Sequence, residues 1–299
     1  MFKSVLIGMD RRLGGRDAVA LAKQLVARDG QLTLAHVYPG DARLSRGSPL
    51  EYERMERNRA VELLTEAREH AGVSAELRYA ESPSVGRGLH ELAESSGADL
   101  LVVGSSERGL VGRVLLGDDT RAALNGAPCA VAIAPAGYSQ RPVAIHRIGI
   151  AYNGTAESQY AVSVARALAQ QCGAELSACE VITLPVYAFV GGPAPIDGVV
   201  EDMVVDARNR IAALGGVEPH AVYGLTGEEL AAYSASVDLL IVGSRGYGPV
   251  GRLVHGSTSE QLARTARCPL LVLTRAGRVA EKGEPEEEAG CPLDMTLTS

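Results

Sequence analysis

The sequence predicts an α/β protein with two doubly wound domains, each built on a five-stranded parallel sheet. Three observations support this fold class. Short apolar runs alternate with amphipathic helical patterns, the same order of elements occurs twice, and the two copies align without a gap over their closing segments. The 299 residues are also enough for two domains of roughly 150 residues each.

The first copy opens with an apolar run that is long enough for a buried strand. A helical pattern follows, because Ala18, Leu21, Ala22 and Leu25 recur at the i, i+3, i+4, i+7 spacing of an amphipathic helix. The later apolar runs do not alternate with polar residues, which is typical of parallel strands buried on both faces. The expected strands are 5–9, 32–37, 76–79, 100–103 and 131–134, with further helices around 60–67 and 86–96.

The second copy repeats this pattern. Residues 99–134 align on 238–273 at a constant offset, and 6–10 align on 149–153. In this copy we expect strands at 176–181, 239–242 and 270–273, and helices around 161–168 and 200–211. A repeat of this length indicates two copies of a domain rather than a solenoid. The sequence therefore predicts one domain over 1–137, a second over 144–275, and a disordered acidic tail over 276–299.

Composition excludes several classes of protein. The net charge is −7, Trp is absent and only two Phe occur, so a nucleic-acid binder is disfavoured. No apolar run reaches the length of a membrane span, and the start of the chain does not resemble a secretory signal. The five cysteines are odd in number and lack a CxxC pair, which fits reduced thiols in the cytoplasm. The six histidines are dispersed, so we expect no metal site in the protein itself.

A glycine-rich segment follows the predicted strand 239–242 and leads into a helix. Its glycines allow a ligand to approach the backbone closely, and the free N–H groups at a helix start attract anions, above all phosphate. Gly246 to Gly251 also matches GxGxxG, but it follows the fourth strand rather than the first, which argues against a dinucleotide fingerprint. The anion site is expected to comprise Val242, Gly243, Gly246, Gly256, Ser257, Thr258 and Ser259.

The spacing of Gly243, Gly246, Gly256 and Ser257 resembles the ATP-binding motif of the universal stress protein family. The short opening strands that end in Asp10 or Asn153 resemble that family too, as do the closing segments around Cys129 and Cys268. The resemblance implies a tandem of Rossmann-like, adenine nucleotide alpha hydrolase-like domains whose last strands pair across a pseudo-twofold axis.

The resemblance also implies a ligand, ATP, with any Mg²⁺ carried by the nucleotide. It places adenine near Asn153 and Val181, and the glycines beside the ribose and phosphates. Arg252 either pairs with phosphate or caps the loop; both interpretations stay open.

The first copy differs at the residues that matter for phosphate. Glu107 replaces the second glycine of the motif, and Asp118 and Asp119 follow the third. Carboxylates at a helix start compete with phosphate for the amides and the dipole, and they repel a polyphosphate. We therefore expect a weaker second site, or none, at Asp10, Val37, Val103, Gly104 and Gly117.

Three functions remain open from the sequence. The first is a cytoplasmic regulator that binds ATP or another adenine nucleotide in the stress response. The second is a slow ATPase, although no carboxylate is evident beside the hydroxyls and His255 of the loop, and we assign no catalytic residue. The third is an interaction module without nucleotide. A homodimer and an unknown protein partner are left open, and neither nucleic acid nor membrane is expected as a partner.

Two repeated residue pairs have structural interpretations. Asp99 and Asp238 precede buried strands and are expected to act as turn or cap residues rather than catalysts. Cys129 and Cys268 open apolar strands and are expected to be buried, inert thiols.

Overall fold

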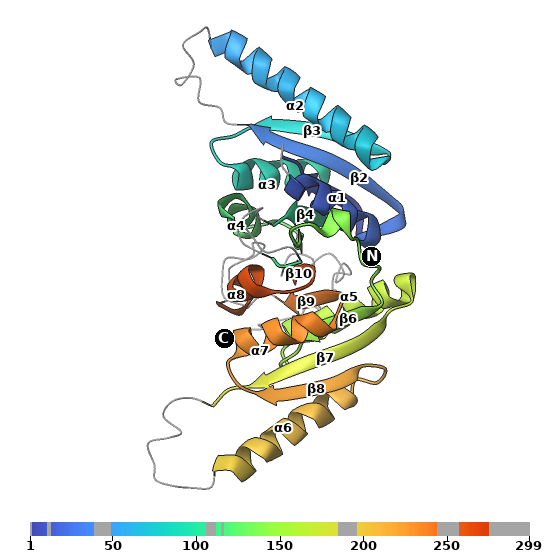
Figure 1. The fold of residues 1–299 in the computed structure, drawn as a ribbon, viewed down its shortest axis with the longest axis vertical. Coiled ribbons are helices and arrows are strands. Elements are labelled where there is room, and N and C mark those ends of the chain that lie inside the picture. The colour runs from blue at the N-terminus through green and yellow to red at the C-terminus, as the bar shows by residue number, and fades with distance from the viewer. Residues whose placement is uncertain are drawn as a thin grey trace, which may run out of the picture.

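The computed structural model describes residues 2–10, 13–38, 49–105, 112–114, 117–184, 196–243 and 257–274. They form an elongated α/β molecule in which one ten-stranded sheet runs from end to end (Figure 1). The strand order is β3-β2-β1-β4-β5-β10-β9-β6-β7-β8. The predicted fold class is confirmed: each half has the order 3-2-1-4-5 with every pair parallel. The acidic tail lies outside the described residues.

The two halves meet at their last strands. β5 (Ala130–Ala134) and β10 (Leu270–Leu273) pair antiparallel, with Leu270 opposite Ile133 and Val272 opposite Val131. This confirms the pairing that the family resemblance implied. The other strands are β1 (Phe2–Gly8), β2 (Val26–Tyr38), β3 (Ala75–Glu81), β4 (Leu100–Gly104), β6 (Arg147–Ala151), β7 (Glu175–Ile182), β8 (Glu218–Tyr223) and β9 (Leu239–Gly243).

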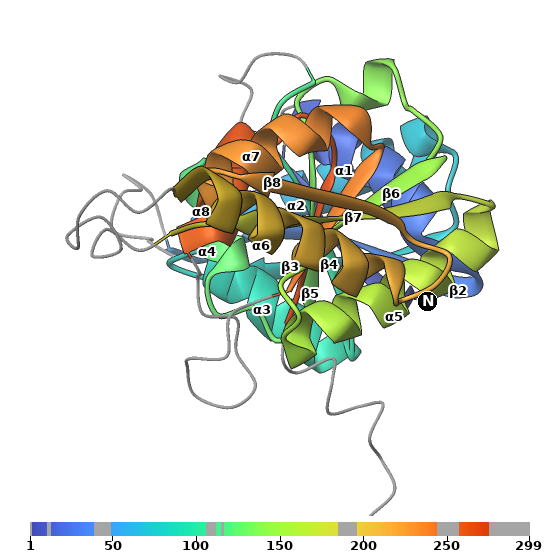
Figure 2. The same cartoon turned by 90° about the horizontal axis from the view of Figure 1, so that it is seen from below.

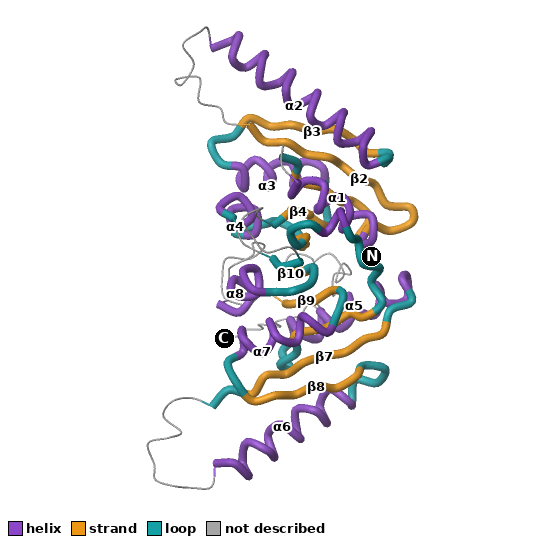
Figure 3. Tube along the Cα trace, viewed as in Figure 1, coloured by secondary structure: helices purple, strands orange, loops and turns teal. Residues whose placement is uncertain are grey.

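Helices cover both faces of the sheet (Figures 2 and 3). One face packs against α1 (Leu13–Leu25), α2 (Pro49–Ala71), α5 (Ala156–Cys172) and α6 (Ile196–Ala212). The other packs against α3 (Val85–Ser96), α4 (Asp118–Leu124), α7 (Thr226–Tyr233) and α8 (Ser257–Thr265). A sheet covered on both sides explains why β4, β5, β9 and β10 are apolar at consecutive positions.

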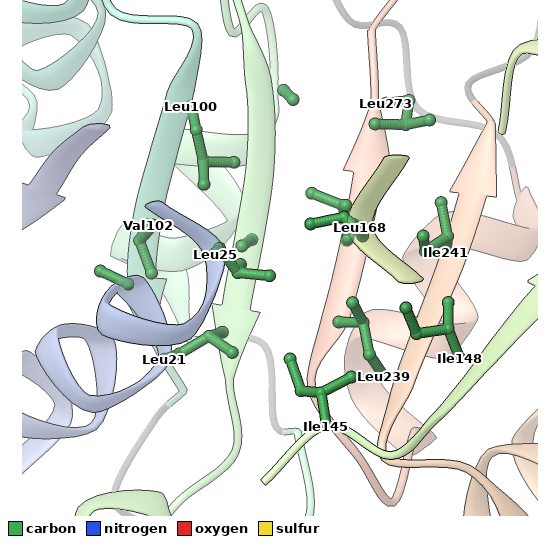
Figure 4. Close-up of a cluster of buried hydrophobic side chains, with 14 of the residues drawn as sticks. Leu21, Leu25, Leu100, Val102, Ile145, Ile148, Leu168, Leu239, Ile241 and Leu273 are labelled. Carbon is green, nitrogen blue, oxygen red and sulfur yellow. The ribbon is translucent and has the colours of Figure 1, made fainter. Parts of the chain in front are cut away.

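The helical periodicity predicted from the sequence forms the core. Ala18, Leu21, Ala22 and Leu25 of α1 are all fully buried, and Figure 4 shows Leu21 and Leu25 beside Leu100 and Val102. The same figure shows the matching cluster in the second half, with Leu168, Leu239, Ile241 and Leu273. Burial of each leucine or isoleucine in these clusters stabilises the fold by about 1.5–3 kcal/mol.

The connection between the halves is attached to α1. It contains a short 3₁₀ helix, η2 (Tyr138–Gln140). The Gln24 Nε2 donates to the Tyr138 hydroxyl at 2.6 Å and to the Val143 carbonyl at 3.0 Å, while its Oε1 accepts from the Ile145 N–H at 3.2 Å. A single side chain of α1 therefore holds three points of the connection.

The largest boundary error concerns the second strand. The sequence predicts 32–37, but β2 begins at Val26, directly after α1. Its register with β1 shifts between the pairs Phe2–Val26 and Ser4–Gln31. Arg28 and Asp29 lie in that irregular stretch. Because they are polar, the stretch does not read as an apolar run in the sequence. In the part of the chain that the structure describes, no helix is long and apolar enough to cross a membrane.

Candidate functional site

The strand order places one switch point in each half. β1 leads to β2 on one side while β4 lies on its other side, and β6 has the same relation to β7 and β9. In doubly wound sheets, ligands bind beyond the carboxyl ends of the strands at such a point. Asp10 and Gly104 lie there in the first half, and Asn153 and Gly243 in the second. These four residues of the two predicted sites therefore lie where the topology favours a ligand.

Asn153 begins a turn that positions α5. Its Oδ1 accepts from the Thr155 N–H at 3.3 Å and from the Thr155 hydroxyl at 2.8 Å. Gly154 adopts a φ of +74° between them, and the Thr155 hydroxyl accepts from the Ser158 N–H at the helix start. The Asn153 side chain is exposed at the edge of the sheet, and its oxygen serves the turn.

Two valines and a glycine continue the edge. Val181 on β7 is half-buried and Val242 on β9 is buried, and both pack on the face covered by α7 and α8. Gly243 does not have a positive φ, and a Cβ there would lie 3.0 Å from the Glu157 carbonyl oxygen. The expectation for Gly243 is therefore incomplete, because the absence of a side chain also allows the start of α5 to pack against the end of β9.

The start of α8 reaches the same edge, because a helix that follows a parallel strand runs back across the sheet. α8 begins at Ser257, Thr258 is half-buried and Ser259 is buried. The glycine loop before it lies outside the described residues, including Gly246, Arg252 and Gly256.

Sequence reasoning missed Thr274. This residue follows Leu273, which pairs with Gly243, and strand alternation puts its side chain on the face that α8 covers. It is 2% exposed, and its buried Oγ1 has no hydrogen-bond partner among the residues that the structure describes. A buried, unpaired hydroxyl is costly, so a polar partner is expected beside it. The signal in the sequence was a hydroxyl where the first copy has Pro135.

The first half is built differently at the same edge. The Asp10 Oδ1 accepts from the Gly15 N–H at 3.3 Å, and the Thr120 hydroxyl donates to the Gly104 carbonyl at 2.9 Å. A Cβ on Gly104 would lie 2.1 Å from the Gly14 carbonyl oxygen, so α1 lies directly against the end of β4. Val37 and Val103 are buried on the face of α3 and α4.

The carboxylates at the start of α4 do not behave as expected. Gly117 is the N-cap residue of α4 and, as a glycine, has no side chain with which to cap the helix. The Asp118 side chain is 99% exposed and pairs with Arg121 at 3.2 Å rather than with the helix amides. The predicted capture of these amides by Asp118 is therefore wrong, because an i,i+3 partner on the same helix attracts the carboxylate instead. Its negative charge remains at the helix start, and Glu107 lies outside the described residues.

The two repeated aspartates have the structural role that the sequence predicted. The Asp99 carboxylate accepts from the N–H groups of Lys3 and Ser4 at 2.7 and 3.1 Å. Asp238 accepts from His146 and Arg147 in the same way, at 3.1 and 2.9 Å. Each aspartate therefore ties the start of the first strand of its half to the fourth.

The two repeated cysteines are buried, as predicted. Burial raises the pKa of the Cys129 thiol to about 12, and the same cause raises the pKa of Cys268. Cys179 of β7 is also buried, and desolvation raises its pKa to about 12. These thiols are uncharged at neutral pH and are poor nucleophiles.

The fold and its two switch points define a tandem, doubly wound α/β protein, and a glycine-rich sequence follows the fourth strand of each half. The model of the universal stress protein family matches residues 1–135 and 144–274. The chain belongs to the universal stress protein family.

Named relatives agree with this assignment. A universal stress protein of Mycobacterium tuberculosis is 27% identical over 292 residues, which cover 90% of this chain and 96% of the relative. One from Thermus aquaticus is 31% identical over 131 residues, 42% of this chain and 95% of the relative. A crystal structure of a universal stress protein from Archaeoglobus fulgidus superposes with a TM-score of 0.64 at 21% identity, covering 91% of this chain and 98% of that one. That similarity shows the fold.

Proposed function

We propose that this universal stress protein is a regulator that binds ATP, or another adenine nucleotide, in its second half. The observation that carries the proposal is the meeting of two features at one switch point. α8 starts at the carboxyl edge of the sheet, and the buried Thr274 hydroxyl beside the end of β9 has no partner within the described part of the chain. Helix-start amides and an unpaired hydroxyl suit a phosphate group.

The described residues support the individual roles as follows. Asn153 and Val181 lie at the ends of β6 and β7, where we propose that the adenine lies. Val242 and Gly243 end β9, so they would flank the ribose, and Ser257, Thr258 and Ser259 would face the phosphates. Gly246, Arg252 and Gly256 complete the proposal from the loop.

The first half is proposed to bind nucleotide weakly or not at all. Asp10, Val37, Val103, Gly104 and Gly117 line the matching edge, but an aspartate begins α4. Its exposed carboxylate leaves a negative charge where a phosphate would approach. The two copies would then have different roles: the second half would bind nucleotide, and the first half would support the shared sheet.

Binding without rapid hydrolysis follows from the groups at the edge. Hydrolysis needs a residue that orients or deprotonates the attacking water. In the second half, the described side chains proposed to contact the ligand are an amide, valines and hydroxyls. Any Mg²⁺ would arrive on the nucleotide, where it would balance the phosphate charge.

The test uses the full chain. Mass spectrometry of the purified protein should detect adenine nucleotide, and calorimetry should give one ATP per chain. ADP release should not exceed that of a protein-free control. Rapid turnover would favour the ATPase alternative. An empty protein that binds no ATP at millimolar concentration would favour an interaction module, and it would overturn the proposal.

A further inference from the structure

A groove lies between α1 and α2 of the first half, and one end of it reaches Asp10 at the carboxyl edge of the sheet. Its volume is about 1300 Å³, and it extends to the connection at Ser139 and Pro142. It lies on the face of the sheet that α1 and α2 cover, whereas Val37 and Val103 face the opposite side. Asp10 is shared with the weaker nucleotide site proposed for the first half, but the inference below uses the α1 and α2 residues of the groove and does not rest on nucleotide binding.

The floor of the groove is apolar and partly open to solvent. Met9 and Val19 are buried beneath it, and Ala20, Leu63 and Ala67 are half-buried. Ala20 on α1 and Ala67 on α2 have small side chains, so another element can come close to both helices. Accessible apolar surface of this kind is typical of a site for an apolar partner.

The walls of the groove carry opposite charges. Arg16 and Lys23 line the α1 side, and Asp10 lies at the end of the groove beside β1. Glu62, Glu66 and Glu69 line the α2 side at the i, i+4, i+7 spacing of one helix face. The α2 side also carries His70 and Arg59, and Arg59 is paired with Glu56 at 2.6 Å, so this wall is acidic on balance. In the described part of the chain, none of the three glutamates and neither basic residue of α1 forms an ion pair across the groove. The Lys23 Nζ instead donates to the Ala71 carbonyl at 2.5 Å, near one end of the groove.

The second half fills the matching position with its own side chains. Tyr152 occupies the position that Met9 has in the first half. The backbone N–H of Met9 donates to the Ala35 carbonyl of β2, and that of Tyr152 donates to the Cys179 carbonyl of β7. The Tyr152 hydroxyl accepts from Gln159, which stands in place of Arg16, at 2.7 Å. The Tyr152 side chain also lies near Arg210, which pairs with Glu180 at 2.7 Å. The first half has no such bridge from Met9, a residue without a polar group.

We propose that this groove binds an amphipathic helix of a partner protein. The apolar stripe of that helix would lie on Ala20, Leu63 and Ala67. Acidic residues on one flank would face Arg16 and Lys23, and basic residues on the other flank would face the glutamates of α2. Helix-in-groove binding uses this combination of apolar anchors and flanking charges.

Charge complementarity fixes both the chemistry and the direction of the bound helix. In one direction along the groove, the acidic flank of the bound helix faces the basic residues of α1 and its basic flank faces the glutamates of α2. In the reverse direction each flank would face a wall of the same charge. The α2 wall from Glu62 to Glu69 spans about 10 Å at 1.5 Å per residue, so a helix of about three turns is sufficient.

Three synthetic peptides test this with the full chain. All share one leucine stripe over four helical turns; one has a glutamate flank and a lysine flank, the second has two glutamate flanks and the third has two lysine flanks. Fluorescence anisotropy should show at least tenfold tighter binding of the mixed peptide. Equal binding of all three, or no binding of the mixed peptide, would overturn the proposal.

Two variants locate the binding site. Glu66→Lys makes one wall mixed in charge, and Ala20→Trp places a large ring in the groove; each should weaken the mixed peptide at least tenfold. Ser163→Trp is the matched control, because Ser163 occupies the Ala20 position on α5 and is exposed. Unchanged binding in Glu66→Lys and Ala20→Trp would place the peptide elsewhere. Self-association of the parent chain that Ala20→Trp abolishes would make a second copy the occupant and overturn the proposal.

Discussion

The Asp17 carboxylate of α1 holds Ser139 of the connection between the two halves. Its Oδ1 accepts from the Ser139 N–H at 2.7 Å and from the Ser139 hydroxyl at 2.6 Å, and its Oδ2 accepts from the Gly137 N–H at 2.8 Å. Asp17 is 1% exposed. A buried charge is tolerated here because three donors from the connection surround it.

We expect Asp17→Ala to lower the free energy of unfolding by about 3 kcal/mol, because it removes three charge-assisted hydrogen bonds and leaves buried donors unpaired. Ser139→Ala keeps both backbone donors to Asp17 and should cost about 1 kcal/mol. Urea unfolding followed by circular dichroism measures both values. Equal losses in the two variants would show that the carboxylate does not organise the connection.

The contrast between Gly104 and Gly243 gives a second prediction. A Cβ on Gly104 would clash with the Gly14 carbonyl oxygen at 2.1 Å, whereas one on Gly243 would meet the Glu157 oxygen at 3.0 Å. Gly104→Ala should therefore cost about 3 kcal/mol of unfolding free energy, and Gly243→Ala about 1 kcal/mol. Thermal unfolding of the two variants measures both losses. A larger loss of stability in Gly243→Ala than in Gly104→Ala would contradict this prediction.

Asp99 and Asp238 are expected to be structural and independent of ligand. Asp99→Ala and Asp238→Ala each remove two hydrogen bonds at the start of a strand pair, so each should cost about 1–2 kcal/mol of stability. ATP affinity of the folded variants should match that of the parent chain. A large change in affinity with unchanged stability would instead place these residues at the ligand.

The buried thiols predict how stability depends on pH. Burial raises the pKa of Cys129 and Cys179 from 9.0 to about 12, so the folded protein holds these protons more tightly than the unfolded chain. Their stabilising contribution is complete below pH 9 and is lost as the pH rises from 9 toward 12. Each thiol then accounts for about 1.4 kcal/mol per pH unit.

Urea unfolding between pH 8 and 10.5 measures that slope. The double variant Cys129→Ala/Cys179→Ala should show a shallower decline above pH 9 than the parent chain, and Cys172→Ala, at an exposed position, is the control. An identical slope in the double variant would exclude ionisation of Cys129 and Cys179 as the cause.

Local patterns were sufficient to predict most of the fold. Burial determines where the elements form, and two sequence patterns indicate burial directly. They are the consecutive apolar residues of β4 and β9 and the helical spacing of Ala18, Leu21, Ala22 and Leu25. The internal repeat then supplied the tandem arrangement. The early start of β2 could not be predicted, because Arg28 and Asp29 are polar and exposed and the register with β1 is irregular between Val26 and Gln31.

Site features that depend on distant contacts could not be predicted. The bond between Asp17 and Ser139 joins residues 122 positions apart. The unpaired hydroxyl of Thr274 becomes visible only when β10 is placed beside β9.

Calorimetric titration of ATP into Ser257→Asp is the most direct test of the nucleotide proposal. This variant gives α8 the acidic start that α4 has, and the matched control Asp118→Asn removes a carboxylate from α4. We expect one site per chain in the parent, at least tenfold weaker binding in Ser257→Asp, and unchanged affinity at that site in Asp118→Asn. Unchanged binding in Ser257→Asp, or loss of binding in Asp118→Asn, would contradict a site in the second half.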